Sequence, residues 1–178
     1  MVPEAPLEQT DTGLVPNGEG WYVVNAKESR WLEHDAFGSG TTFEGEPRFQ
    51  QLGINISVLE PGQPLCLYHR ENAQEDFLVL WGEGRLLVEE QERPLKQWDF
   101  VHCPPETNHV IVGAGDGTCG VLAVGFRPPD EALMYPASEL AAKYGASAEQ
   151  ETPDPREAYA RFERPRPVQY NGQLDAAS

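Results

Sequence analysis

Short apolar runs separated by glycine, proline and charged residues fill the chain between residues 50 and 127. The runs that we predict to be strands are Ile54–Leu59, Leu65–His69, Phe77–Trp81, Leu86–Val88, Phe100–Val101, Val110–Val112 and Val121–Phe126. Turn-forming pairs such as Pro61-Gly62 and Pro104-Pro105 lie between them. Strands that recur at such short intervals are typical of an antiparallel sandwich or barrel, so we predict an all-β domain at residues 50–127.

The segments on either side of this domain have other patterns. Residues 1–49 begin with a stretch rich in proline, glycine and acidic residues, which we expect to be a loose arm. Apolar pieces such as Trp21–Val24 then predict one strand and loops that pack on the barrel. Residues 128–178 predict short helices and a tail, because Ser138 and Asp154 can each cap a helix. A chain of 178 residues therefore holds one domain with two appendages.

Composition and charge narrow the range of partners. The chain has 29 acidic and 13 basic residues and a formal net charge of -16, which disfavours nucleic-acid phosphates and anionic membranes as partners. No apolar stretch approaches the ~18 residues of a membrane helix, and no basic leader opens the chain. We therefore expect a cytoplasmic protein whose partner is a small molecule or another protein. The cysteines show no Cys-x-x-Cys pairing, so we expect reduced thiols.

Four side chains that can bind a metal ion are spaced so that the predicted strands bring them together. In a strand that ends at Glu71, side chains alternate, so His69 and Glu71 point to the same face. A short turn then returns the chain and places Glu75 beside them. His109 follows a stiff segment with two prolines that can aim it at the same point. Buried imidazoles and carboxylates need a charged partner, and we predict a bound cation.

Three further residues are candidates for the wall of a pocket around this site. Phe77 and Trp81 share the face of Glu75 in their predicted strand. His102 can face the same cavity as a hydrogen-bond donor to a metal ligand or a substrate. The alternative is an ordinary structural role, with the two aromatic residues in the core and the histidine packed or at the surface.

The spacing of these residues resembles the cupin family. The residues that match its first motif are Gly62, His69-Arg70-Glu71, Glu75 and Gly82. The residues at the positions of its second motif are Trp98, Asp99, Pro104, Glu106, His109 and Gly113. The resemblance covers roughly residues 50–127. It implies a double-stranded β-helix, the jelly-roll barrel of cupins, with a divalent metal ion in its mouth. The implied ligands are His69, Glu71, Glu75 and His109.

The chain also departs from the family pattern. Glu71 stands where most members have a second histidine, and Trp98, Glu106 and Gly113 replace the usual Gly, Gly and Asn. Two histidines and two glutamates would formally neutralise a divalent ion, which makes it a weaker Lewis acid. Alternatively, Glu71 leaves the metal, and two histidines with Glu75 form a facial triad with open positions. Mixed nitrogen and oxygen ligands suit Zn, Fe, Mn and Ni, so the identity of the ion stays open.

The resemblance leaves two classes of function. The first is a metal-dependent enzyme, of oxygenase, isomerase or lyase type, that acts on a small organic molecule and has Glu71 or Glu75 as a candidate base. The alternative is a non-catalytic cupin that binds or senses a small ligand through the metal. A metal with an open position favours catalysis, whereas a closed shell of four ligands favours a structural role. A third possibility is a barrel that binds no metal and retains only the residues of the motif.

The predicted strand Phe77–Trp81 is apolar on both faces, although a barrel wall normally has one polar face. Its outer face must therefore be covered by the amino-terminal aromatic residues, by the carboxy-terminal helices or by a second copy of the chain. Many cupins pair in this manner. We therefore predict a homodimer.

Overall fold

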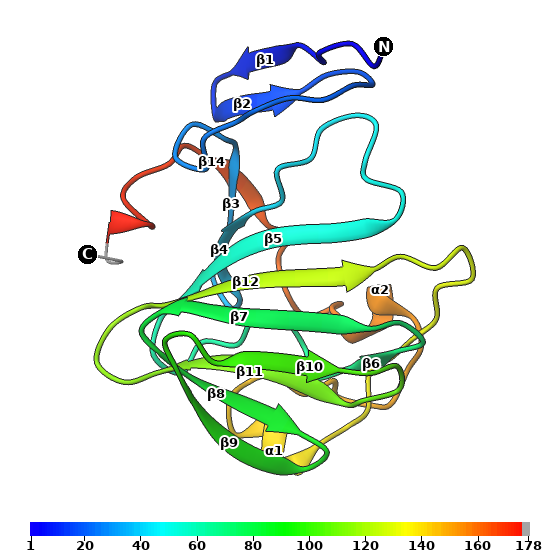
Figure 1. Ribbon diagram of the computed structural model, residues 1–178. Helices are drawn as coiled ribbons and strands as arrows, with labels where there is room; N and C mark the ends of the chain where they lie inside the picture. Colours follow the sequence, from blue (N-terminus) through cyan, green and yellow to red (C-terminus); the bar gives the residue numbers. More distant parts are fainter. Residues whose placement is uncertain (176–178) are drawn as a thin grey trace.

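The computed structural model describes residues 1–175 as a β-rich fold with two short helices (Figure 1). The strands are β1 (Leu7–Thr10), β2 (Gly13–Pro16), β3 (Trp31–His34), β4 (Gly38–Thr41), β5 (Leu52–Leu59), β6 (Arg70–Glu71), β7 (Glu75–Trp81), β8 (Glu83–Val88), β9 (Gln91–Lys96), β10 (Phe100–Cys103), β11 (His109–Ala114), β12 (Cys119–Phe126), β13 (Leu133–Met134) and β14 (Arg166–Val168). The helices are α1 (Glu139–Ala142) and α2 (Pro155–Ala158). The paired strands are antiparallel, and the predicted all-β class is confirmed.

Two sheets pack on each other to form the jelly-roll body. The larger sheet has the strand order β10-β7-β12-β5-β4-β3-β14, and the smaller has the order β11-β8-β9. Along β7, side chains alternate, so Phe77 and Val79 point inward and are buried. They join Val121 of the larger sheet and Ile111 of the smaller in one core cluster. The cluster also contains Cys103 and Cys119, and all three cysteines are free thiols.

The amino-terminal stretch is not the loose arm that its composition predicts. β1 and β2 form an antiparallel hairpin, at the top of the molecule in Figure 1, with Leu7 paired to Pro16. The backbone N–H of Leu14 donates to the carbonyl of Glu28, which connects the hairpin to the following loop. Pairing of backbone groups therefore orders a segment that has few apolar side chains to bury.

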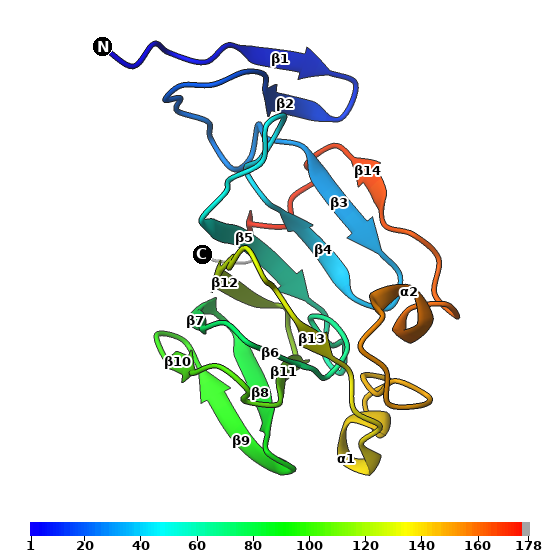
Figure 2. The same cartoon turned by 90° about the vertical axis from the view of Figure 1, so that its right-hand side faces the viewer.

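The carboxy-terminal segment contains the two predicted helices, which lie beside the barrel in Figure 2. Ser138 caps α1 by accepting a hydrogen bond from the N–H of Ala141, and Asp154 caps α2 by accepting from the N–H of Arg156. Both predicted caps are confirmed. Within residues 1–175, no helix has the length and apolar character needed to cross a membrane.

The predicted strand from Leu65 to Glu71 is only partly present. Leu65 and His69 bond to β11, and β6 is two residues long. Between them, the N–H of Tyr68 donates to the carbonyl of Ala146, and the N–H of Leu67 donates to the Tyr159 hydroxyl. The carboxy-terminal segment thus takes the hydrogen bonds that a neighbouring strand would have taken. The prediction of a continuous strand was therefore wrong.

Two of the departures from the family pattern occupy a backbone conformation that favours glycine. Trp98 has φ 73° and Glu106 has φ 67°. The left-handed region costs an L-residue roughly 1–2 kcal/mol, and glycine escapes that cost. The turns at these positions therefore keep the conformation that the usual glycines would adopt, although the residue types differ.

Candidate metal centre and ligand pocket

Three of the four predicted metal ligands converge inside the barrel. Ligand atoms of His69, Glu75 and His109 all lie within 4.8 Å of one another. Oε2 of Glu75 lies 3.4 Å from Nε2 of His69 and 3.0 Å from Nε2 of His109. Two atoms bound to one ion at about 2.1 Å lie no more than about 4.2 Å apart, so the group is close to the spacing of a metal site.

Backbone pairing places the two histidines side by side. His69 and His109 form an isolated antiparallel bridge, in which the N–H of His109 donates to the carbonyl of His69 at 2.8 Å. Glu75 is the first residue of β7. The site is therefore built from the first residues of β7 and β11 and from the residue just before β6.

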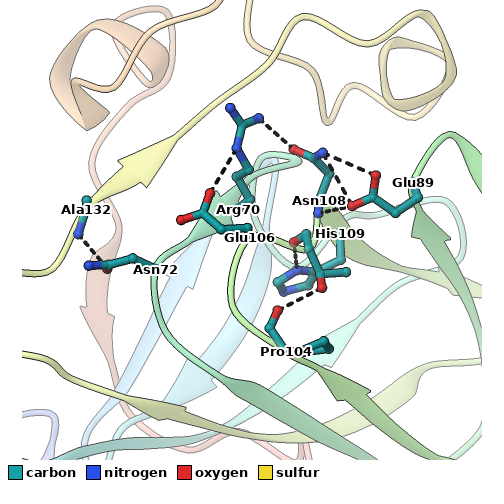
Figure 3. A network of polar contacts seen from close by, with 9 residues as sticks. Arg70, Asn72, Glu89, Pro104, Glu106, Asn108, His109 and Ala132 are labelled. Atoms are coloured by element: carbon teal, nitrogen blue, oxygen red, sulfur yellow. Dashed lines mark hydrogen bonds and ion pairs between the residues drawn. The ribbon is translucent and has the colours of Figure 1, made fainter.

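Polar contacts fix the turn that precedes His109 (Figure 3). The N–H of Asn108 donates to the Glu89 carboxylate at 2.7 Å, and Arg70 donates to the Asn108 side-chain oxygen at 3.1 Å. Arg70 also pairs with Glu106 at 3.4 Å. Contacts from three segments hold the turn, so the imidazole of His109 is oriented before any ion binds.

In His69 and His109, a hydrogen bond at Nδ1 leaves Nε2 to face the site. Nδ1 of His69 lies 2.9 Å from the carbonyl oxygen of Leu67, and Nδ1 of His109 lies 2.9 Å from that of Thr107. A carbonyl oxygen only accepts, so each Nδ1 carries a proton and donates it. Each Nε2 is then the nitrogen available to the site, which is the usual arrangement of a metal-binding histidine.

The buried atoms at the centre lack hydrogen-bond partners. Oε2 of Glu75 and Nε2 of His109 make no hydrogen bond with any residue in the range 1–175, although only 3.0 Å separates them. Buried polar atoms are nearly always paired. With neutral imidazoles, the lone pairs of two nitrogens and a carboxylate point toward a common region. A divalent cation fits this set of donors.

The pKa values reflect the same crowding of donors. Burial opposes the ionisation of Glu75, but the imidazoles of His109 and His69 offset it and hold the pKa of Glu75 well below its usual range. Burial also opposes charge on His109, yet contacts with Cys103 and Glu75 raise its pKa to about 10. Protons therefore supply the positive charge in the metal-free protein. A metal ion that binds here must displace them, so its affinity falls as the solution becomes more acidic.

Glu71, the fourth predicted ligand, lies outside the group of three. It is buried, and burial together with the neighbouring Glu75 raises its pKa to about 8. Glu71 is therefore protonated at neutral pH and hydrogen-bonds to Glu75. This geometry matches the alternative in which two histidines and Glu75 bind the ion. The role of Glu71 as a direct ligand stays a prediction.

A cavity of about 770 Å³ opens onto the three converging side chains. Phe77 lines it and packs edge-on against His109, with 5.3 Å between ring centroids. Residues of β3, β4, β5, β11 and β12, of the segment before β6 and of the carboxy-terminal segment form the rest of its wall. A cavity of this size accommodates a small organic molecule.

Two of the predicted pocket residues lie elsewhere. His102 is on the outer face of β10, because its neighbours Val101 and Cys103 point into the core, and its Nδ1 lies 2.7 Å from Asp76. Trp81 is buried six residues beyond Glu75 on β7, about 20 Å along a strand. Its indole N–H donates to the Thr118 hydroxyl at 3.3 Å. We therefore correct both expectations.

Sequence reasoning also missed residues that do line the cavity. Tyr135 stacks on His69 with 5.8 Å between ring centroids, and Tyr159, Arg156 and Arg164 contribute to the wall. They follow the barrel by many residues and belong to no motif. The aromatic residues near the predicted second helix were the only signal in the sequence.

Comparison with known proteins shows which family and which solved structures the chain resembles. A family model described as a cupin domain matches residues 55–125. A sugar phosphate isomerase of the cupin superfamily from Silicibacter pomeroyi is 26% identical, with a TM-score of 0.50, over 64% of this chain and 69% of that chain. A predicted oxalate decarboxylase from Thermotoga maritima is 19% identical, with a TM-score of 0.51, over 60% of this chain and 100% of that chain.

A third similar structure is a proposed sugar phosphate isomerase from Acidithiobacillus ferrooxidans, with 30% identity and a TM-score of 0.45 over 47% of this chain. The chain spans little more than half of that protein, 55% of its length. No curated protein sequence matches the chain significantly. Residues 55–125 of this chain therefore match a cupin domain, and their antiparallel jelly-roll sheets have the cupin fold.

Proposed function

We propose that this chain is a metal-dependent enzyme that acts on a small organic molecule in the 770 Å³ cavity, with His69, Glu75 and His109 as metal ligands. The observation that carries the proposal is the convergence of three metal-binding side chains on one cavity, with buried atoms of Glu75 and His109 that lack a hydrogen-bond partner within residues 1–175. Three protein ligands leave coordination positions for a substrate, which is the pattern of catalytic sites. The ion is Zn, Fe, Mn or Ni, all of which accept this mixture of nitrogen and oxygen ligands.

Among oxygenase, isomerase and lyase chemistry, we propose the isomerase type. The support is the similarity to the sugar phosphate isomerase from Silicibacter pomeroyi. A bound divalent ion would polarise a carbonyl or hydroxyl oxygen of the substrate. Glu71 holds a proton beside Glu75 but does not line the cavity, so it reaches the substrate only through Glu75. Phe77 and Tyr135 line the cavity and pack against the rings of His109 and His69, which gives the site an apolar wall.

The test begins with protein purified without chelators and analysed for metals by elemental mass spectrometry. We expect nearly one ion per chain. The loaded protein is then incubated with aldose and ketose phosphates in deuterated water, and incorporation of deuterium beside the carbonyl is followed by NMR. Metal-dependent incorporation supports the isomerase. Less than about a tenth of an ion per chain, unrestored by reconstitution, rejects the metal site. Metal binding without turnover favours the alternative, a cupin that binds or senses a small ligand.

We also propose that the chain forms a homodimer through the outer face of the larger sheet. Part of this face is covered within the chain, because Leu80, Tyr170 and Leu174 pack against one buried cluster that contains Trp31 and Trp81. Beyond that cover, Leu52 and Phe126 pair across β5 and β12 and are exposed, and Phe100 on β10 is 64% exposed. Within residues 1–175, β10 is also the end strand of the sheet, with backbone groups available for pairing. A second copy would cover the apolar face and this edge together.

Light scattering after size-exclusion chromatography tests the dimer. The unaltered chain is expected to elute as a dimer at micromolar concentration, and Phe100→Glu as a monomer, because a charge in an apolar interface is costly. Val23→Glu is the matched control, since Val23 is exposed on the amino-terminal segment outside this patch. A monomeric unaltered chain, or a dimer that survives Phe100→Glu, would reject this interface.

A further inference from the structure

Tyr135 presents an unused hydrogen-bond donor to the cavity. Its side chain is only 6% exposed, stacked on His69 and edge-on to Tyr159. Its backbone pairs with Thr152, which fixes the ring in place. Its hydroxyl makes no hydrogen bond to any residue in the range 1–175, yet Tyr135 lines the cavity. The buried side-chain atoms without a partner among residues 1–175 belong to Glu75 and His109, so the Tyr135 hydroxyl is not sealed off, and a ligand oxygen in the cavity can accept its proton.

Other polar groups of the cavity wall are also donors. The Tyr159 hydroxyl accepts from the N–H of Leu67 at 3.0 Å, so its own proton is available to a ligand. The side-chain oxygen of Asn55 accepts from the Ser57 hydroxyl at 3.1 Å, which leaves the Asn55 amide protons for the cavity. A wall rich in donors is complementary to a ligand rich in acceptors, and in small metabolites these are oxygen atoms.

The opening of the cavity contains two arginines without carboxylate partners. Arg156 and Arg164 line it, both are exposed, and neither forms an ion pair within the described part of the chain. The arginines that do pair with carboxylates are Arg70, Arg85, Arg127, Arg161 and Arg166. In a chain of net charge -16, two guanidinium groups without a carboxylate partner in one cavity wall are suited to an anionic ligand. Glu163 is the one carboxylate that lines this opening among residues 1–175, and it does not pair with either arginine.

We propose that the pocket binds a small oxygen-rich organic anion, in which one oxygen accepts from Tyr135 and the charged group pairs with Arg156 and Arg164. This inference rests on the proposed function, because the ligand occupies the same cavity. The metal ion offsets the negative charge of Glu75 at the inner end, so the anion is not repelled there. The charged group of the ligand is a carboxylate or a phosphate, since both accept from a guanidinium group.

Calorimetric titration of the metal-loaded protein with ribose 5-phosphate, ribonate and ribose tests the charged end. We expect at least one anion to bind roughly tenfold more tightly than neutral ribose, because two exposed ion pairs add a modest attraction. The stronger of the two anions identifies a phosphate or a carboxylate. The double variant Arg156→Ala/Arg164→Ala should remove this preference, whereas the control Arg93→Ala, on β9, should keep it. Failure of both anions to bind at millimolar concentration would overturn the proposal.

Tyr135→Phe tests the inner end of the pocket. We expect about a fivefold loss of affinity for the anion that binds, with the metal content unchanged, because a single hydrogen bond is removed. The control is Tyr144→Phe, since the Tyr144 hydroxyl bonds to Glu92 and does not line the cavity. A loss of metal in Tyr135→Phe would make the tyrosine a metal ligand and reject its assigned role. Anion binding without turnover rejects only the proposed enzyme, and turnover without a preference for anions rejects only this inference.

Discussion

His109→Ala is expected to remove most of the bound metal, with a loss of affinity of at least roughly a hundredfold. His109 contributes one of three converging ligands, and its Nε2 has no other partner in residues 1–175. The two groups that remain, His69 and Glu75, cannot enclose an ion as tightly. Elemental mass spectrometry of the purified variant measures the metal content, and competition with a chelator measures the affinity.

The fold should survive this substitution, because the core does not depend on the ion. Val79, Ile111 and Val121 pack together without contribution from the metal ligands. His109→Gln, which keeps more of the side-chain volume, separates loss of a ligand from loss of packing, and both variants should retain the circular dichroism spectrum. His102→Ala is the matched control, since His102 is exposed and bonds to Asp76 outside the site. Unchanged metal content in both His109 variants would refute the ligand assignment.

The strands and helix caps follow from local patterns in the sequence. The period-two pattern of β7 predicts its buried face, and Phe77 and Val79 lie there. Ser138 and Asp154 predict the starts of their helices, because a capping side chain accepts a hydrogen bond from a backbone N–H two or three residues further along the chain. The convergence of His69, Glu75 and His109 was expected from side-chain alternation, a short turn and a stiff proline segment, and the resemblance to cupins supported the pairing of these distant segments.

The remainder of the site depends on contacts that no local pattern encodes. The run from Leu65 to His69 looks like a strand, but Ala146 and Tyr159, far along the chain, take part of its backbone hydrogen bonds. His102 was misplaced by its proximity in sequence to the second motif, although alternation along β10 turns it outward. Tyr135 carries no signal at all, because its position depends on pairing with Thr152.

A second large effect is expected from Arg127→Met, which should lower the free energy of unfolding by about 2–3 kcal/mol. Arg127 follows β12 and binds Glu44 of the amino-terminal segment, with Nη1 2.7 Å from Oε1 and Nη2 3.3 Å from Oε2. Nη1 also donates to the carbonyl of Phe49 at 2.7 Å. The Glu44 side chain is only 7% exposed, so removal of the guanidinium leaves a buried carboxylate without its cation.

Urea unfolding followed by tryptophan fluorescence measures this loss, and an unchanged slope would show that the unfolded state is not altered. Arg166→Met is the control, because its ion pairs with Glu33 and Asp35 are exposed and should contribute little to stability. Glu44→Gln in the Arg127→Met background should recover part of the stability, since an uncharged amide costs less to bury. Equal losses in the two arginine variants would mean that the Glu44 pair does not hold the amino-terminal segment on the barrel. β4 lines the ligand cavity and lies just before Glu44 in the sequence. If the Arg127→Met variant frees the amino-terminal segment from the barrel, ligand binding should also weaken. Its metal content should stay unchanged.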